Sequence, residues 1–206
     1  ADDIVTKGYD GTMDANQMLD YAESGIFEIS QARQKGQYSH IRDVLVENLA
    51  IIDRAEQMDG GLTGITTGFS KLDEMTSGMQ KSDLIILAAR PAMGKTAFAL
   101  SLARNAAVKG KASVMIFSLE MAKEQLTQRL LSMESKVDLQ TLKTGRLERR
   151  DWDDLNVALD ILSNSNIHID DTAGISIMEM KSKCRRLKAE AGLDLVIIDY
   201  LQLMNP

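Results

Sequence analysis

The chain has 206 residues, enough for one domain or for one domain with a smaller appendage. Apolar residues make up 44% and charged residues 26%, which is ordinary for a globular protein and excludes a wholly disordered or collagen-like chain. The net charge of −6 excludes a uniformly basic nucleic-acid binder but is compatible with a local basic groove. One tryptophan, four tyrosines and four phenylalanines supply a base-stacking platform only poorly.

The cysteine content and the hydropathy indicate in which cellular compartment the protein works. Cys184 is the single cysteine, which excludes a disulfide framework and a cysteine-built zinc site and fits a reducing cytosol. The longest apolar run is Leu84–Ala89, far short of the roughly 18 residues that a membrane span needs. The first residues carry no export signal. We therefore expect a cytoplasmic protein without membrane contact.

The first sixty residues have helical spacing and no strand pattern. Asp14 and Gln17 are spaced as in a capping box, with Asp in place of Ser or Thr. They predict a helix over about residues 14–35 that ends near Gly36. Its apolar positions recur at helical spacing: Met18, Ala22, Ile26, Ile29 and Ala32.

A second helix is predicted over about residues 40–58, with Ser39 as its N-cap and Asp59-Gly60-Gly61 after it. Its apolar stripe comprises Ile41, Leu45, Leu49 and Ile52. Two such helices have only one narrow face to bury against each other. We expect residues 1–59 to form a helical linker region that either packs on the main domain or reaches a neighbouring subunit, and the pattern leaves both open.

The pattern changes after these helices, and residues 60–206 are predicted to form a second unit. One short helix begins after Ser70, and strands then alternate with helices. Ser176 and Glu179 form a capping box at the last helix. Uninterrupted apolar strands between helices favour an α/β fold with a mostly parallel sheet covered on both faces. The predicted strands are 84–89, 113–118, 166–170 and 195–199, and the predicted helices are 96–108, 123–135, 147–162 and 176–191.

Gly94-Lys95-Thr96 follows the apolar run and a short loop, and precedes a helix rich in Ala and Leu. This is the strand–loop–helix setting of a phosphate-binding loop. Backbone N–H groups near Met93 and Gly94 and the helix N-terminus suit phosphate oxygens. Lys95 would supply its charge to the β- and γ-phosphates, and Thr96 its hydroxyl to Mg²⁺.

One position departs from the full phosphate-loop pattern, because Ala89 stands where that pattern has its first glycine. The glycine of the full pattern only eases the backbone conformation at the start of the loop, whereas the lysine and the hydroxyl bind the phosphates and the metal ion. We therefore retain the prediction. A surface lysine and threonine at an ordinary helix start is the alternative.

Two carboxylates follow predicted strands. Asp199 ends the strand 195–199, where a buried carboxylate is costly unless something pairs with it, so Mg²⁺ support or a cap is expected. Glu120 lies just past the strand 113–118 and would accept a proton from an attacking water, or else favour the N-terminus of the next helix. Parallel sheets place ligands at the carboxyl ends of their strands, where both residues fall.

Longer motifs surround these residues: Ala89-Arg90-Pro91-Ala92-Met93-Gly94-Lys95-Thr96-Ala97-Phe98, Phe117-Ser118-Leu119-Glu120-Met121, Ile198-Asp199-Tyr200-Leu201-Gln202-Leu203-Met204, Asp83-Leu84-Ile85-Ile86, Asp151-Trp152 and Gly64-Ile65-Thr66-Thr67-Gly68-Phe69. Together they closely resemble the motifs of the bacterial DnaB-type replicative DNA helicases. The resemblance runs from about Gly60 to the end and more loosely over the N-terminal helices. The family usually has Ala or Ser at the position of Ala89.

The resemblance implies a RecA-like ATPase core that uses ATP and Mg²⁺ in a homohexameric ring and moves along single-stranded DNA. It implies that Glu120 activates water and that Thr96 and Asp199 support the metal. Arg129 matches an arginine near the phosphates, although it could equally be a solvated helix residue. Gln202 is a weaker candidate for a polar link between the nucleotide and the DNA-contacting loops, and packing at the strand edge is an equal alternative. The implied nucleotide-binding segment is Met93, Gly94, Lys95, Thr96 and Ala97.

The family also implies primase and a helicase loader as partners at the replication fork, with helix 14–35 docking on the adjacent subunit. In the family, further strands follow the Asp199 strand, one of them between it and the phosphate-loop strand. The DNA-contacting loops and a trans arginine finger also come later. We therefore expect a fragment with weak activity of its own. The alternatives are a RecA- or recombinase-type ATPase of other function and a non-hydrolysing assembly fragment.

Four weaker features carry mainly structural interpretations. The basic helix residues could contact a DNA backbone or a subunit, but a solvated face is favoured. His168 is expected to pack in the core or at the sheet edge, Asp170-Asp171 to begin a loop, and Cys184 to be an ordinary helix residue. The basic residues are Lys181, Lys183, Arg185, Arg186 and Lys188.

Overall fold

The computed structural model describes Lys7, Tyr9 and residues 14–34, 40–56 and 62–204. The predictions for Gly36, for the Ser39 cap, for residues 57–58 and for Asp59-Gly60-Gly61 lie outside the described residues. The described elements are α2 (Ala15–Gln34), α3 (Ile41–Glu56), α4 (Ser70–Thr76), α5 (Lys95–Val108), β1 (Val114–Ser118), α6 (Lys123–Ser135), α7 (Leu139–Thr144), α8 (Arg149–Ser163), β2 (Ile167–Asp170), α9 (Ile177–Glu190), β3 (Leu195–Asp199) and the 3-10 turn η1 (Leu201–Leu203).

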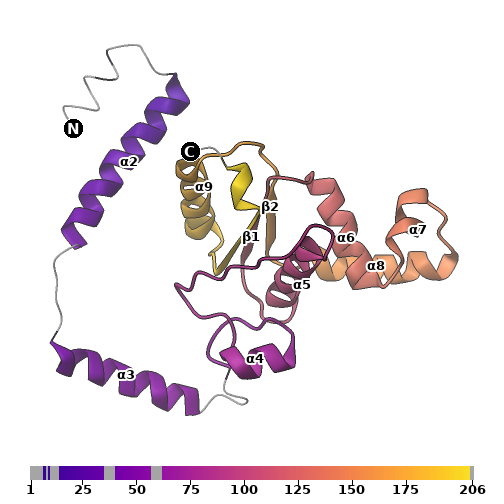
Figure 1. Cartoon of the computed structure of the whole chain (residues 1–206), viewed down its shortest axis with the longest axis horizontal. Coiled ribbons are helices and arrows are strands. Elements are labelled where there is room, and N and C mark those ends of the chain that lie inside the picture. Colours follow the sequence, from indigo (N-terminus) through magenta and orange to yellow (C-terminus); the bar gives the residue numbers. More distant parts are fainter. Residues whose placement is uncertain (1–6, 8, 10–13, 35–39, 57–61, 205–206) are drawn as a thin grey trace.

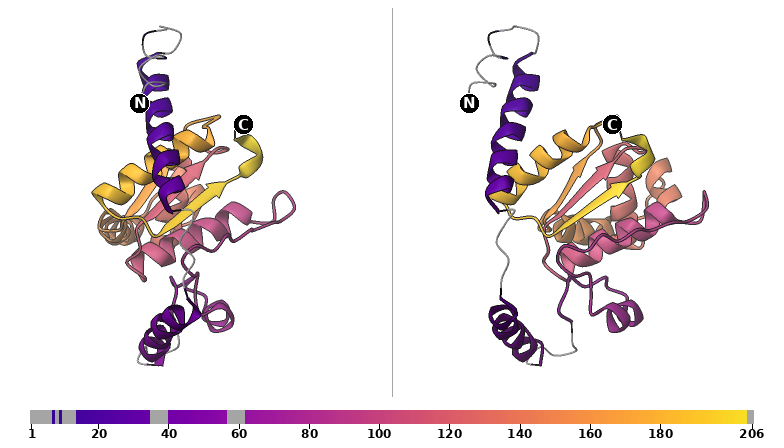
Figure 2. Two further views of the ribbon diagram at one scale, coloured as in Figure 1. Left: turned by 90° about the vertical axis from the view of Figure 1, so that its left-hand side faces the viewer. Right: turned by 60° about the vertical axis from the view of Figure 1, so that its left-hand side comes forward.

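The three strands form a parallel sheet in the order β2-β1-β3, with α9 on one face and α5 and α6 on the other (Figures 1 and 2). Ile116 in the central strand is in register with Ile169 and Ile197. The carboxyl ends of the strands therefore meet at one edge, where Ser118 lies beside Asp199. The predicted α/β class with a parallel sheet flanked by helices is confirmed.

The core has two halves because successive residues of β1 point to opposite faces of the sheet. Ile116 packs with Leu100 and Ala103 of α5 on one face, and Phe117 packs with Met180 of α9 on the other. Both faces of β1 are buried, which is why its sequence is apolar without alternation. This buried strand fixes the place of Glu120, which follows it.

The prediction of a buried strand over residues 84–89 is wrong. Leu84 is 85% exposed and Ile86 is 74% exposed, and the segment joins no sheet in the described part of the chain. It is separated from β3 by a cavity of about 350 Å³. A strand requires a neighbour whose N–H and C=O groups meet its own, and β3 does not approach closely enough. The phosphate loop is therefore anchored through α5.

Helix caps explain two further differences from the predicted elements. α8 begins at Arg149 because Glu148 and Asp151 form a capping box there. The short helix α7 was not predicted, since six residues are too few to display an apolar period. Its signals are Asp138, which accepts hydrogen bonds from two first-turn N–H groups, and Gly145, whose φ is 67° at the C-cap.

The two N-terminal helices differ in what they contact. The predicted capping box is confirmed at the start of α2, where the Gln17 N–H donates to Asp14 Oδ1 at 2.8 Å. α2 lies against α9, and Ser182 Oγ donates to Glu23 Oε2 at 3.0 Å. α3 stands away from the sheet (Figure 1) with an uncovered apolar stripe: Ile41, Leu45, Leu49 and Ile52 are all exposed. None of the described helices is long and apolar enough to cross a bilayer.

Candidate nucleotide-binding site

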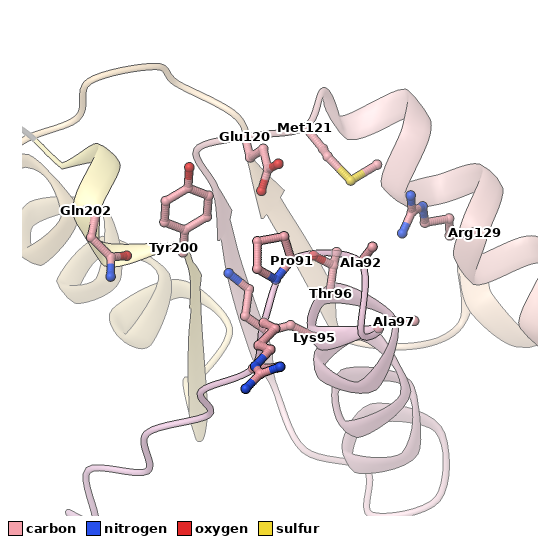
Figure 3. A pocket seen from close by; sticks show the side chains of 13 residues that line it. Pro91, Ala92, Lys95, Thr96, Ala97, Glu120, Met121, Arg129, Tyr200 and Gln202 are labelled. Carbon is pink, nitrogen blue, oxygen red and sulfur yellow. The ribbon is translucent and has the colours of Figure 1, made fainter.

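A cavity of about 660 Å³ opens at the carboxyl edge of the sheet (Figure 3). Four parts of the chain line it: the loop Ala89–Ala92, the start of α5, the turn after β1 and the turn after β3. Arg129 reaches it from α6. The residues of the three resembling motifs, which lie far apart in the sequence, are thereby brought together at the sheet edge where parallel folds place ligands.

The loop before α5 turns sharply because two of its residues have a left-handed backbone. Ala92 has a φ of 63° and Gly94 a φ of 86°. A Cβ at position 94 would meet nothing within 4 Å, so the backbone conformation, not space, favours glycine there. No side chain caps α5, and Gly94, Lys95, Thr96 and Ala97 line the cavity, which leaves the helix N-terminus available to an anion.

Met93 is placed differently from the other residues of this segment. Its N–H donates to the Arg90 carbonyl at 3.3 Å, and its side chain is 73% exposed. It does not line the cavity. Because its N–H closes the turn of the loop, a phosphate role for Met93 would require that hydrogen bond to open.

Asp199 joins the end of β3 to the start of α5. Thr96 Oγ1 donates to Asp199 Oδ2 at 2.6 Å, and Lys95 Nζ lies 3.3 Å from Asp199 Oδ1. The aspartate is 8% exposed, so these two partners compensate a carboxylate that would otherwise be costly to bury. The ammonium, hydroxyl and carboxylate predicted to bind nucleotide and metal are thus in direct contact.

Tyr200 is a site residue that the sequence interpretation missed. Lys95 Nζ lies 4.2 Å from the centroid of its ring, and Figure 3 shows the Lys95 side chain directed toward Tyr200. Its position directly after Asp199 was the available signal. Gln202, two residues further on, also lines the cavity and is exposed.

Glu120 and Arg129 face the cavity from the other side. Neither has a hydrogen-bond or ion-pair partner within the described part of the chain, although Arg129 is half-buried. The turn that carries Glu120 is fixed by Ser118, whose Oγ donates to the Met121 carbonyl at 2.6 Å. The cavity therefore holds a carboxylate and a guanidinium that are both free to bind a ligand or a water molecule.

Arg129 lies in the middle of α6, and the first residue of this helix is hydrogen-bonded to the segment that follows β2. The Lys123 N–H donates to Asp171 Oδ2 at 3.0 Å, and Ala122 at the N-cap provides no side-chain acceptor. Asp170 binds Lys183 Nζ at 2.6 Å. Burial alone would raise the pKa of the Asp170 carboxyl, but hydrogen bonds from Lys183 and Thr172 bring that pKa below its ordinary value. Asp170-Asp171 is therefore an anchor at the end of β2.

The remaining sequence candidates lie away from the cavity. By their spacing, Lys181, Arg185 and Lys188 are expected to form one exposed side of the helix. Lys181 and Lys188 are exposed, but Arg185 is half-buried, while Arg186 is exposed and Lys183 is bound to Asp170. His168 packs within β2, and its buried Nε2 has no partner among the described residues. Cys184 is half-buried and packs against the core cluster that contains Phe117 and Met180, and burial raises the pKa of its thiol.

The residues present fit a hard divalent cation bound together with a ligand. Asp199 and Thr96 provide a carboxylate and a hydroxyl oxygen at one point, the donor types that Mg²⁺ prefers. The described residues contain no group of three or more His, Cys, Asp or Glu side chains that could hold a metal ion alone. A cation here would therefore share its coordination with phosphate and water oxygens.

Comparison with known proteins assigns the family. The model of the DnaB-like helicase C terminal domain matches residues 64–206. The chain is 48% identical over 205 residues to the replicative DNA helicase DnaB of Geobacillus stearothermophilus, covering 100% of this chain and 45% of that protein. It is 48% identical over 202 residues to the replicative DNA helicase DnaC of Bacillus subtilis, covering 98% of this chain and 44% of that protein. The chain thus spans less than half the length of these relatives.

Solved structures agree with this assignment. A chain solved as an ATPase domain superimposes with a TM-score of 0.74 and 38% identity, over 82% of this chain and 60% of that one. A DnaB-like replicative helicase, described with its interactions with primase, superimposes with a TM-score of 0.70 and 35% identity, over 99% of this chain and 48% of that one. The chain belongs to the DnaB-like replicative DNA helicase family, and 64–206 is its match to the C-terminal domain.

Proposed function

We propose that the chain is the nucleotide-binding part of a replicative DNA helicase, in which ATP hydrolysis drives movement along single-stranded DNA and duplex unwinding. The observation that carries this proposal is the contact of Lys95 and Thr96 with Asp199, beside a cavity lined by Glu120 and Arg129, which have no partner in the described part of the chain. Each of these groups has a distinct task in phosphoryl transfer.

The phosphates of ATP would lie over the N-terminus of α5, where the helix field and the N–H groups of Gly94–Ala97 favour an anion. Lys95 would bind the β- and γ-phosphates as a point charge. Thr96 and Asp199 would hold Mg²⁺, which when bound neutralises charge on the phosphates. Arg129 would bind the outer phosphates from α6.

Glu120 would take the proton of the attacking water. Its carboxylate lies at the cavity, is exposed and has no competing partner among the described residues, which leaves it available as a base. The water oxygen would form a bond to the γ-phosphorus while the bond from that phosphorus to the β–γ bridging oxygen breaks, which leaves ADP and inorganic phosphate, with the proton of the water on Glu120. Gln202, on the turn after Tyr200, lines the same cavity, so its side chain would contact the bound nucleotide or the released phosphate.

We further propose that copies of the chain assemble into a ring, the homohexamer that the family implies, at the replication fork with primase and a loader. We propose helix 14–35 for the docking on a neighbouring subunit, as the family implies, and the exposed stripe of α3 as a second candidate surface for that contact. Leu45, Leu49 and Ile52 are 54–61% exposed, an apolar stripe that water disfavours. A head-to-tail contact of this kind closes into a ring when the rotation permits.

Nucleotide binding can be tested separately from hydrolysis and DNA unwinding. Titration of Mg²⁺-ATP should give saturable binding to the 206-residue chain, and Lys95→Ala should abolish it. Lys109→Ala, at the exposed far end of the same helix, is the matched control and should bind as the unmodified chain does. Binding that survives Lys95→Ala would remove the nucleotide site from this loop.

A non-hydrolysing assembly role is the second candidate, supported by the exposed apolar stripe of α3. It predicts nucleotide binding by this chain without turnover. Single-turnover hydrolysis, measured with and without single-stranded DNA on a chain extended to the length of its relatives, distinguishes the two. Absence of DNA-stimulated hydrolysis in the extended chain would leave only the assembly role or an ATPase of other function.

A further inference from the structure

Lys95 lies between two consecutive residues at the end of β3. Its Nζ is 3.3 Å from the Asp199 carboxylate and 4.2 Å from the centre of the Tyr200 ring. The carboxylate supplies an opposite charge, and the ring presents the negative face of its quadrupole to the ammonium. Lys95 is 28% exposed and Tyr200 half-buried, so water competes with this contact only in part.

The Lys95 ammonium and the Thr96 hydroxyl, which a nucleotide and its metal ion would need, are thus both bound to residues at the end of β3. Thr96 donates its hydroxyl to Asp199, and Lys95 points toward the ring of Tyr200 (Figure 3). Lys95 is itself the first residue of α5, whose uncapped N-terminus lines the same cavity and favours an anion. A phosphate bound there would compete with Asp199 and Tyr200 for the Lys95 ammonium.

We propose that Tyr200 is a positioning residue that holds Lys95 at the end of β3 in the empty site and releases it when a nucleotide binds. This inference rests on the proposed nucleotide site. It gives Tyr200 an energetic part in the binding equilibrium, because the cation–π contact is lost when the phosphate contact forms. Tyr200 opposes binding, and Lys95 and Thr96 favour it.

The expected effect is modest and has a defined sign. A cation–π contact of this exposure is worth about two- to fivefold in an equilibrium constant. Tyr200→Leu removes the ring but keeps apolar bulk, and should tighten Mg²⁺-ADP binding by about that factor. Tyr200→Phe keeps the ring face and should bind Mg²⁺-ADP as the unmodified chain does.

The chain offers a matched control for the loss of a cation–π contact. Lys7 Nζ lies 4.2 Å from the centroid of the Tyr21 ring, the same distance as in the Lys95–Tyr200 pair, but on α2. Tyr21→Leu should leave the affinity for Mg²⁺-ADP unchanged. Calorimetric titration of the four proteins with Mg²⁺-ADP measures all these effects.

A second measurement needs no nucleotide. A double-mutant cycle of Tyr200→Leu and Lys95→Met, read out by urea unfolding of the free chain, isolates the contact in the empty site. Asp199 loses its ammonium partner but keeps the Thr96 hydroxyl in both Lys95→Met proteins, so the cost of that loss cancels. The effects on the unfolding equilibrium constant should deviate from simple multiplication by about two- to fivefold.

The outcomes separate this inference from the proposed function. If the unmodified chain fails to bind Mg²⁺-ADP, the proposed site fails, and the cycle alone still decides whether Tyr200 holds Lys95. If the chain binds and Tyr200→Leu binds equally or more weakly, the release role is overturned, and weaker binding assigns the ring to the bound nucleotide. Multiplicative effects in the cycle would remove the contact itself.

Discussion

Thr96 and Asp199 are 103 residues apart in the sequence, and the hydroxyl of one donates to the carboxylate of the other at 2.6 Å. The bond joins the first turn of α5 to the last residue of β3, across the sheet edge. It links the phosphate loop directly to the strand that ends in the buried carboxylate. The groups around this bond, and the surfaces beyond it, can each be tested by substitution.

Glu120→Gln should keep nucleotide affinity and slow hydrolysis, because the amide keeps the size of the side chain but cannot accept the proton of water. The expected loss in the single-turnover rate is about 10²–10⁴. Glu124→Gln, in the first turn of α6 and outside the cavity, is the control and should leave the rate unchanged. Equal loss of affinity and rate in Glu120→Gln would assign Glu120 a structural role.

Arg129→Gln should weaken ATP binding by about 10- to 100-fold, because a hydrogen bond to a charged group contributes about 1.5–3 kcal/mol. The guanidinium is half-buried and has no partner in the described structure, so its removal breaks no existing ion pair. Stability should therefore change little, which urea unfolding checks. Arg149→Gln, exposed at the start of α8, is the matched control. Unchanged affinity would make Arg129 a solvated residue.

Lys183→Met should destabilise the fold at neutral pH by about 1–3 kcal/mol, because it leaves the Asp170 carboxylate without its charged partner. The pKa of Asp170 is lowered in the folded chain, so its contribution is present above the unfolded value of 3.8 and is lost as the pH falls through the folded pKa.

The difference between Lys183→Met and the unmodified chain should therefore shrink when urea unfolding is repeated from pH 7 to below pH 3.8. Lys181→Met, exposed on the same helix, should show no difference at either pH. A pH-independent cost of Lys183→Met would mean that its aliphatic stem, and not its charge, stabilises the contact.

Leu19→Glu should lower the mass of any oligomer, because it places a charge at an exposed apolar position of α2, the helix that we propose docks on the neighbouring subunit. Leu49→Glu makes the same change in the apolar stripe of α3, the second candidate surface. Sedimentation with nucleotide present measures both. A loss of mass in Leu49→Glu alone would assign the docking to α3.

Much of the architecture is readable from local patterns. The apolar periods and caps predicted α6 and β3 with their observed bounds, and Ser176 accepts the Glu179 N–H as its capping pattern predicts. Such features depend on neighbours within one or two turns of the chain. The sequence likewise proposed Lys95, Thr96, Asp199 and Glu120 as site residues from their positions at the ends of predicted strands and loops, and the structure brings them to one edge of the sheet.

Only the tertiary structure decided what lies across the sheet edge. Leu84–Ala89 has the composition of a strand, but a cavity lies between it and β3, so its backbone groups find no partner strand among residues 14–34, 40–56 and 62–204. The Lys95–Tyr200 contact depends in the same way on where α5 and β3 end relative to each other. Hydrophobic period and capping are properties of a short segment, whereas strand pairing and side-chain contacts between segments depend on the packing of the whole core.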